Sequence, residues 1–190
     1  MSNLKKIEGG VTTPQGFTAG AVYTAIKKRE NKKPDVAVLY SDLPCSCAAC
    51  FTTNKFCAAP VILDREILKK GKARAVVINS GNANAATGKQ GIEDARTVER
   101  EAEKLLGLGE DEVFVCSTGV IGQTLNIAAI RAGMPAAECL VSEGSDVEIK
   151  RCGSAGLFVR CVAGRRLRSA SFGVGSVGET SARAIPTRYG

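Results

Sequence analysis

The sequence predicts an α/β fold, a mixed layered domain of sheet and helix. Residues 35–42, 73–79 and 112–116 are short apolar runs rich in β-branched side chains, which is typical of buried strands. Residues 92–106 repeat apolar side chains at intervals of three and four, which is the spacing of one helix face. Because such strands alternate with helices along the chain, the pattern favours layers of sheet and helix.

Turn and capping residues predict where these elements end. A further apolar run occupies residues 58–63, and Asp64 is predicted to cap a helix over residues 65–70 that stops at Gly71. Gly107 is the predicted end of the long helix described above.

The long helix is expected to turn its apolar face to the core and its polar face to solvent. The residues expected on the polar face are Glu93, Asp94, Arg96, Glu99 and Arg100. Further along, residues 117–122 are predicted to form a turn, and residues 125–134 a helix that Pro135 ends.

Composition limits the chemistry. The chain has 190 residues, eight cysteines and no histidine, which excludes His-dependent nucleophilic catalysis and an H-E-x-x-H zinc site within it. No apolar run approaches the roughly 20 residues that span a bilayer, and residues 1–10 lack the apolar stretch of a signal peptide. We therefore expect a cytoplasmic protein with reduced thiols and no membrane contact.

The net charge of +7 is spread unevenly, and the difference suggests two parts. Residues 1–138 carry a net +3 and residues 139–190 a net +4, and the last 40 residues hold seven Arg, no Lys and one acid. We divide the chain into a domain over 1–138 and a divergent Arg/Gly/Ser-rich tail over 139–190. Since aromatic residues make up only 5%, too few for a stacking surface, we expect no nucleic-acid partner.

The predicted tail has little periodicity. Residues 156–163 could form a strand, whereas residues 164–190 show no core face, as expected of a solvated or poorly ordered segment. The change from Lys to Arg, with enrichment of Cys, Gly and Ser, is also what a shifted reading frame in a GC-rich gene produces. Both origins stay open.

Four cysteines lie close together in the sequence: Cys45, Cys47, Cys50 and Cys57. The C-x-x-C spacing of Cys47 and Cys50 can hold zinc or an iron–sulfur cluster, or form a redox pair. The second pair is irregular and Cys57 lies in apolar surroundings, so we favour packing and expect no metal. A non-catalytic metal-binding or interaction module built on these cysteines is the alternative function.

Two predicted strand-to-loop junctions, residues 79–84 and 117–122, place small residues with Asn or Thr directly after a buried strand. Backbone N–H groups or a Thr hydroxyl there can stabilise negative charge that develops on oxygen. Turn geometry alone is the simpler explanation for such loops. Neither junction carries a nucleotide-binding glycine pattern.

Four motifs occur in order along residues 5–138. They are Gly9-Gly-Val-Thr-Thr-Pro-Gln-Gly-Phe17 with Thr18-Ala-Gly20, Phe51-Thr-Thr-Asn-Lys55 with Ala58-Ala-Pro-Val61, Asn79-Ser-Gly-Asn-Ala-Asn84 with Thr87-Gly88, and Ser117-Thr-Gly-Val-Ile-Gly122. Their combination resembles the ornithine acetyltransferase family, the bifunctional glutamate N-acetyltransferases of arginine biosynthesis, in its N-terminal (α-chain) part.

The resemblance implies a precursor that cleaves itself before a Thr, which becomes the nucleophile at the start of a β chain. Its α-amine would serve as the base that His supplies elsewhere. The implied reaction moves acetyl from N-acetylornithine to glutamate, with acetyl-CoA a further donor in some members. It implies no cofactor, and an α/β heterotetramer as the assembly.

The same resemblance assigns site residues. Thr118 and Gly119 match the family's oxyanion hole, while Asn82 and Asn84 are expected near it in an architectural role. Beyond residue 139 the family's later α-chain segment, with its substrate-binding Thr, its Lys-Gly-Ser-Gly run and its Met-Ala-Thr junction, is not recognisable. We therefore expect no nucleophile in this chain, no identified substrate-binding residue and no activity of the chain alone.

Overall fold

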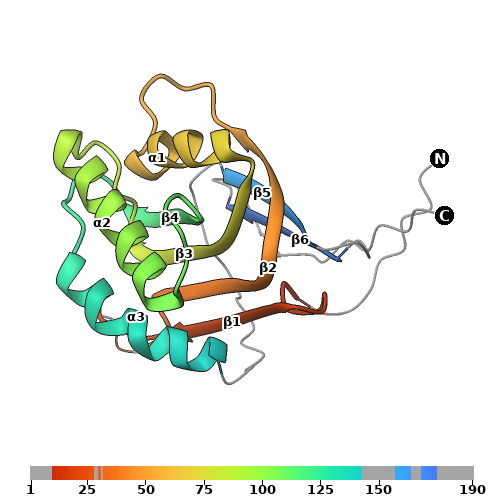
Figure 1. Cartoon of the computed structure of the whole chain (residues 1–190). Coiled ribbons are helices and arrows are strands. Elements are labelled where there is room, and N and C mark those ends of the chain that lie inside the picture. Colours follow the sequence, from red (N-terminus) through yellow and green to blue (C-terminus); the bar gives the residue numbers. More distant parts are fainter. Residues whose placement is uncertain (1–9, 28–29, 31, 143–156, 164–167, 175–190) are drawn as a thin grey trace.

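The structure, a computed structural model, describes residues 10–27, 30, 32–142, 157–163 and 168–174 of the chain (Figure 1). Its elements in chain order are β1 (Phe17–Val22), β2 (Val36–Phe51), α1 (Ala59–Ile67), the 3-10 turn η1 (Leu68–Lys70), β3 (Lys72–Asn82), α2 (Gly88–Leu106), β4 (Val113–Val120), α3 (Ile127–Ser142), β5 (Leu157–Ala163) and β6 (Arg168–Val174). The predicted alternation of strands and helices is confirmed.

A bent, six-stranded sheet organises these elements. The strand order is β4-β3-β2-β5-β6, with β1 paired to β2 as well. Only β3 and β4 are parallel among these pairs. The 16-residue β2 serves two partners along the edge that β3 leaves open: residues 36–41 pair with β1, and residues 45–51 pair with β5. Figure 1 shows the bend of β2 between these two parts.

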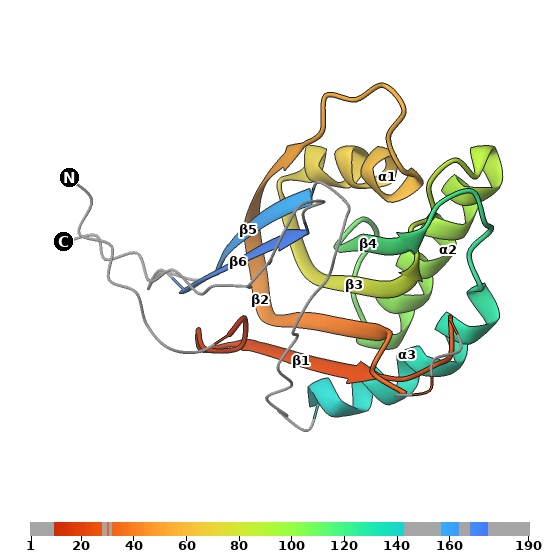
Figure 2. The ribbon, with the colours of Figure 1, turned by 180° about the vertical axis from the view of Figure 1, so that it is seen from behind.

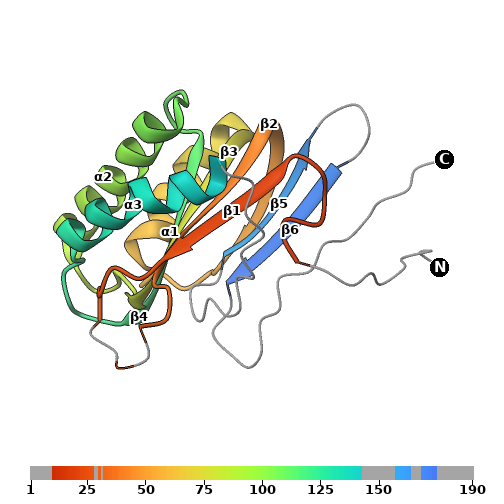
Figure 3. The same cartoon turned by 90° about the horizontal axis from the view of Figure 1, so that it is seen from below.

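The core lies between the sheet and the three helices, which gather on one side of it, away from β5 and β6 (Figures 1 and 3). Helices α1 and α2 pack on β4, while α3 lies along β1 and β2 (Figure 2). Val77, Phe114 and Val115 in the central strands are fully buried, as the apolar runs predicted. Among the described residues, no helix combines the length and apolar character that crossing a bilayer requires.

Asp64 does not cap a helix, so that prediction is wrong. Helix α1 begins earlier, at Ala59, with Pro60 in the first turn where its missing N–H group leaves no hydrogen bond unmade. Asp64 therefore lies within the helix, fully buried, and its Oδ1 accepts the N–H of Val115 in β4 at 3.0 Å. The predicted stop at Gly71 is confirmed, with a left-handed φ of 66°.

Helix α2 ends at Gly107 as predicted, but its buried face is rotated from the expected one. Glu99 and Asp94, both expected in solvent, are 1% and 8% exposed. Ile92 and Leu105, which belong to the apolar stripe, are 37% and 40% exposed. The reason is that α1 packs beside α2 and covers part of its polar face.

Two elements extend further than predicted. Residues 117–120 continue β4 instead of forming a turn, because they stay paired with β3. Helix α3 continues to Ser142 and contains Pro135, which was predicted to end it. An interior proline costs a helix about 3 kcal/mol. Met134 and Ala137 on either side are fully buried, so packing holds the helix through the proline.

Two strands lie in the predicted tail. β5 confirms the strand expected near residues 156–163, whereas β6 was not predicted, because its composition has no clear period. Both extend the sheet from the last part of β2. The boundary at residue 138 and the origin of the tail stay predictions. The parts of the tail that lie outside the described residues are 143–156, 164–167 and 175–190.

Candidate active site

The two strand-to-loop junctions predicted from the sequence lie side by side. Because β3 and β4 are parallel neighbours, their carboxyl ends meet at one edge of the sheet. Their register sets Ser80 opposite Thr118 and Gly81 opposite Gly119. A register shift follows at Asn82, which is paired with both Thr118 and Val120. The fold thus brings the predicted oxyanion residues against the Asn-containing loop.

Gly119 makes the closest backbone approach in this region. Its φ is 135°, a value that side chains rarely allow. A Cβ atom there would lie 2.6 Å from both the carbonyl oxygen of Gly81 and the backbone nitrogen of Asn82, and closer still to the carbonyl carbon of Gly81. This position therefore requires glycine because two strand ends meet there. The turn geometry of an exposed loop would not by itself create this requirement.

Asn79 and Asn82 hold the loop after β3 through their side chains. The Asn79 amide donates to the carbonyl of Asn82 at 2.9 Å. The Asn82 amide donates in turn to the carbonyls of Gln123 at 3.2 Å and Thr124 at 2.9 Å, beyond β4. These bonds join the two loops, so the architectural role expected for Asn82 fits its contacts.

Asn84 fixes the start of α2. It has a left-handed φ of 47° and is fully buried. Its side-chain amide donates to the carbonyl of Gly91 at 2.7 Å, and its Oδ1 accepts the Thr87 hydroxyl at 2.8 Å. Its own N–H donates to the Asn82 side chain at 2.8 Å. The side chain is therefore engaged with the loop and the start of α2, which is an architectural arrangement.

Thr118 supplies the one hydroxyl of the predicted oxyanion pair, and it is 5% exposed. Within the described part of the chain, this hydroxyl has no hydrogen-bond partner. The neighbouring Ser117 hydroxyl is fully buried and is likewise unpartnered there. An unused hydroxyl donor beside the N–H of Gly119 is what stabilisation of a developing oxyanion requires.

The four clustered cysteines do not converge. Cys45, Cys47 and Cys50 all lie on β2, where residues three apart point to opposite faces, so the C-x-x-C pair is split. Cys45 is buried and Cys50 is exposed. Within the described residues, no three His, Cys, Asp or Glu side chains are placed to hold a metal ion. The metal-binding alternative therefore has no support in the fold.

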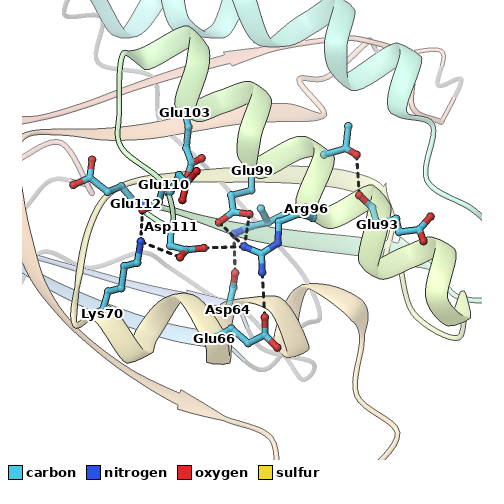
Figure 4. Close-up of polar contacts among 12 residues, drawn as sticks. Asp64, Glu66, Lys70, Glu93, Arg96, Glu99, Glu103, Glu110, Asp111 and Glu112 are labelled. Atoms are coloured by element: carbon cyan, nitrogen blue, oxygen red, sulfur yellow. Dashed lines mark hydrogen bonds and ion pairs between the residues drawn. The ribbon is translucent and has the colours of Figure 1, made fainter.

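A second group of polar residues surrounds Arg96 on α2 (Figure 4). Its guanidinium contacts Glu99 at 2.9 Å, Asp111 at 2.8 Å and Glu66 of α1 at 3.1 Å. Lys70 also pairs with Asp111, at 3.0 Å. Because Asp111 precedes β4 while Thr118 lies near its end, this ion-pair group and the oxyanion pair are at opposite ends of that strand.

Burial dominates the electrostatics of the ion-pair group. It raises the pKa of Glu99 to about 7, against the opposing effect of Arg96. Burial also raises the pKa of Asp64 well above its ordinary range, although the Val115 N–H bond opposes this. Asp111 differs, because the hydrogen bond from Lys70 lowers its pKa. These residues carry no nucleophile and are best explained as the link between α1 and α2.

The raised pKa of Glu99 makes the fold less stable as pH rises. The folded state holds the proton up to about pH 7, while the unfolded state releases it near 4.5, so stability falls across that window. We expect the free energy of unfolding to drop by about 2 kcal/mol between pH 5 and pH 8. Asp111 does not offset this, because its lowered pKa stabilises the fold at all pH values above its ordinary 3.8.

Urea unfolding at a series of pH values measures this slope. Glu99→Gln should reduce it, leaving the part that comes from the raised pKa values of Asp64 and Glu103, and should stabilise the chain at pH 8, because Gln keeps an acceptor for Arg96 without a buried charge. Glu93→Gln, on the exposed side of the same helix, is the matched control and should leave the slope unchanged. An undiminished slope in Glu99→Gln would show that another group titrates.

A comparison with known families decides where this arrangement belongs. The model described as "ArgJ family" matches residues 18–155, which include both junctions and Thr118 and Gly119. The chain belongs to the ArgJ family. The resemblance drawn from the four motifs is therefore confirmed, and so is the α/β fold.

Curated ArgJ relatives match about three quarters of the chain. The arginine biosynthesis bifunctional protein ArgJ of Caldanaerobacter subterraneus subsp. tengcongensis is 46% identical over 140 residues, which is 74% of this chain and 34% of the relative. The mitochondrial ArgJ of Aspergillus terreus is 45% identical over 148 residues, or 76% and 32%. The chain thus spans about a third of the length of these relatives.

Two solved ArgJ-type structures match almost the whole chain. The arginine biosynthesis bifunctional protein of Bacillus halodurans has a TM-score of 0.70 at 26% identity, covering 97% of this chain and 98% of that one. The ornithine acetyltransferase of Mycobacterium tuberculosis, solved in complex with ornithine, has a TM-score of 0.71 at 26% identity, covering 97% and 100%. The match therefore agrees with a fold that includes β5 and β6 of the predicted tail.

Proposed function

We propose that this chain is the α-chain part of a glutamate N-acetyltransferase/ornithine acetyltransferase. It moves an acetyl group from N-acetylornithine to glutamate in arginine biosynthesis, and acetyl-CoA is a possible further donor. The observation that carries the proposal is the contact of Gly119 with the Gly81 backbone, which sets Thr118 and Gly119 at the end of a buried strand. Membership of the ArgJ family supports the same reaction.

The role we assign to Thr118 and Gly119 is to hold the charged oxygen of each tetrahedral intermediate. A Thr hydroxyl from a β chain of the same precursor attacks the acetyl carbonyl, and the carbonyl oxygen becomes an oxyanion. The Thr118 hydroxyl and the Gly119 N–H donate to it, the ornithine amine leaves, and glutamate then takes the acetyl group from the Thr ester. Preorganised donors are effective because they do not need to reorient as charge develops.

The chain covers about a third of its curated relatives and 98% and 100% of the two solved chains. The β chain, the heterotetramer and autocatalytic cleavage remain part of the proposal. A cytoplasmic location is part of it too, although the Aspergillus terreus relative is named as mitochondrial.

A chimaera tests the proposal. Residues 18–138 of this chain replace the aligned segment of the full-length Caldanaerobacter subterraneus ArgJ, which supplies the rest of the enzyme. We expect the chimaera to release ornithine from N-acetylornithine in the presence of glutamate, and the purified 190-residue chain to show no turnover. A folded chimaera without turnover would contradict the proposed function. Turnover by the chain alone would contradict the need for a second chain.

A further inference from the structure

We propose that Asp35 is a positioning residue for the oxyanion pair, acting through the turn at residues 23–27 and through Gly81. The inference deepens the proposed function and rests on it for its kinetic consequence. The sequence predicts only that Asp35 begins a strand. In the structure its side chain is 3% exposed and holds a turn that the sequence did not predict.

The Asp35 carboxylate accepts hydrogen bonds from the residues on both sides of Ala25. Its Oδ1 accepts the N–H of Thr24 at 2.6 Å and the Thr24 hydroxyl at 3.0 Å, and its Oδ2 accepts the N–H of Ile26 at 3.0 Å. Ala25, between them, has a φ of 58°, which a residue with a side chain adopts only when its surroundings impose it. The carboxylate therefore fixes the shape of this turn.

The turn packs against the end of β3, at Gly81. A Cβ atom on Gly81 would lie 3.1 Å from the Cβ of Lys27 and 3.3 Å from the Cγ2 of Ile26, so there is no space between the turn and this glycine. Asp35 is also tied to the same strand end by its backbone, because its carbonyl accepts the N–H of Ser80 at 2.8 Å.

The other side of the turn is closed by α3. Thr24 packs so closely on Gly133 that a Cβ atom there would overlap the Thr24 side chain. The turn is thus enclosed between a helix and Gly81, and Gly81 in turn lies against Gly119 with no space for a Cβ. If the turn moved, Gly81 would move as well, and the Gly119 N–H, which packs against Gly81, would be displaced. Direct contacts therefore connect Asp35 with the oxyanion pair.

Thr24 offers a matched pair of variants. Thr24→Val keeps both branches of the side chain but removes the hydroxyl that donates to Asp35. Thr24→Ser keeps this hydroxyl and removes the methyl group that faces Gly133. If the hydrogen bonds to Asp35 position the oxyanion pair, Val should reproduce the effect of Asp35→Asn and Ser should not.

The first readout is the amide resonances of Gly81 and Gly119 in the 15N-labelled 190-residue chain, which needs no activity. We expect both to shift in Asp35→Asn and Thr24→Val and to stay near their original positions in Thr24→Ser. Shifts confined to residues 23–27, with Gly119 unmoved, would overturn the inference. If the Asp35→Asn variant does not fold, the resonances of Thr24→Val by themselves test the inference.

The second readout is kinetic and uses the chimaera described above. Asp35→Asn and Thr24→Val should lower kcat about tenfold with KM unchanged, since a misplaced donor weakens transition-state binding more than substrate binding. A chimaera that is active without these changes but unaffected by them would overturn the inference and leave the proposed function intact. A wild-type chimaera without turnover would contradict the function, while the resonances would still test the positioning.

Discussion

Gly119→Ala is expected to lower the free energy of unfolding by about 4 kcal/mol or more, enough to prevent a small domain from folding fully. The added Cβ would meet backbone atoms of Gly81 and Asn82, which belong to the adjacent parallel strand and have no flexible end to move away. The φ of 135° adds strain that only glycine avoids. Strand β3 or β4 would have to separate to relieve the overlap.

Gly122→Ala is the matched control, three residues further along the same segment. Gly122 also has a positive φ, 80°, but nothing lies within 4 Å of its Cβ position. Gly122→Ala should lower the free energy of unfolding by about 1 kcal/mol, as is usual for an alanine in the left-handed region. Urea or thermal unfolding of both variants measures the difference. Equal costs would mean that the close contact of Gly119 with Gly81 does not constrain the fold.

Thr118→Ala is expected to lower kcat of the chimaera by 10²–10³, or about 2.7–4 kcal/mol of transition-state stabilisation, as loss of one oxyanion donor typically does. KM should change little, because the oxyanion exists only after the nucleophile has attacked. The fold should survive, since the Thr118 hydroxyl makes no hydrogen bond within the described residues and alanine keeps the strand geometry.

Thr118→Ser is the control for the hydroxyl itself. Serine keeps the donor and loses only a methyl group, so it should retain most of the activity that alanine loses. Steady-state rates with N-acetylornithine and glutamate, together with unfolding midpoints, separate catalysis from stability. If serine and alanine lower kcat equally, Thr118 acts through packing. If neither does, the oxyanion donor lies elsewhere.

Apolar runs predicted the central part of the fold because buried strands need continuous hydrophobic residues. Val76, Val77 and Ile78 in β3 are examples, and all are buried. The same rule missed β6, where arginine, serine and glycine carry no period. It also could not place Asp64 or Pro135, because the packing of α1 and α3 outweighs the local preferences of both residues.

Local signals likewise predicted only part of the candidate site. Small residues after two strands marked the loops, and the parallel pairing of β3 and β4 that joins them is a long-range contact. The Asp35 turn depends on Gly81 and Gly133, which lie far from it in the sequence. Nothing next to Asp35 distinguishes it from an ordinary residue at the start of a strand.

The two-partner geometry of β2 has a consequence for the order in which the domain assembles during synthesis. Along the edge that β3 leaves open, residues 36–41 pair with β1 early, whereas residues 45–51 wait for β5, which leaves the ribosome much later. Until then this half of β2 has an unpaired edge able to join a strand from another chain. We expect nascent chains that stop before residue 157 to aggregate through this edge more readily than the completed chain.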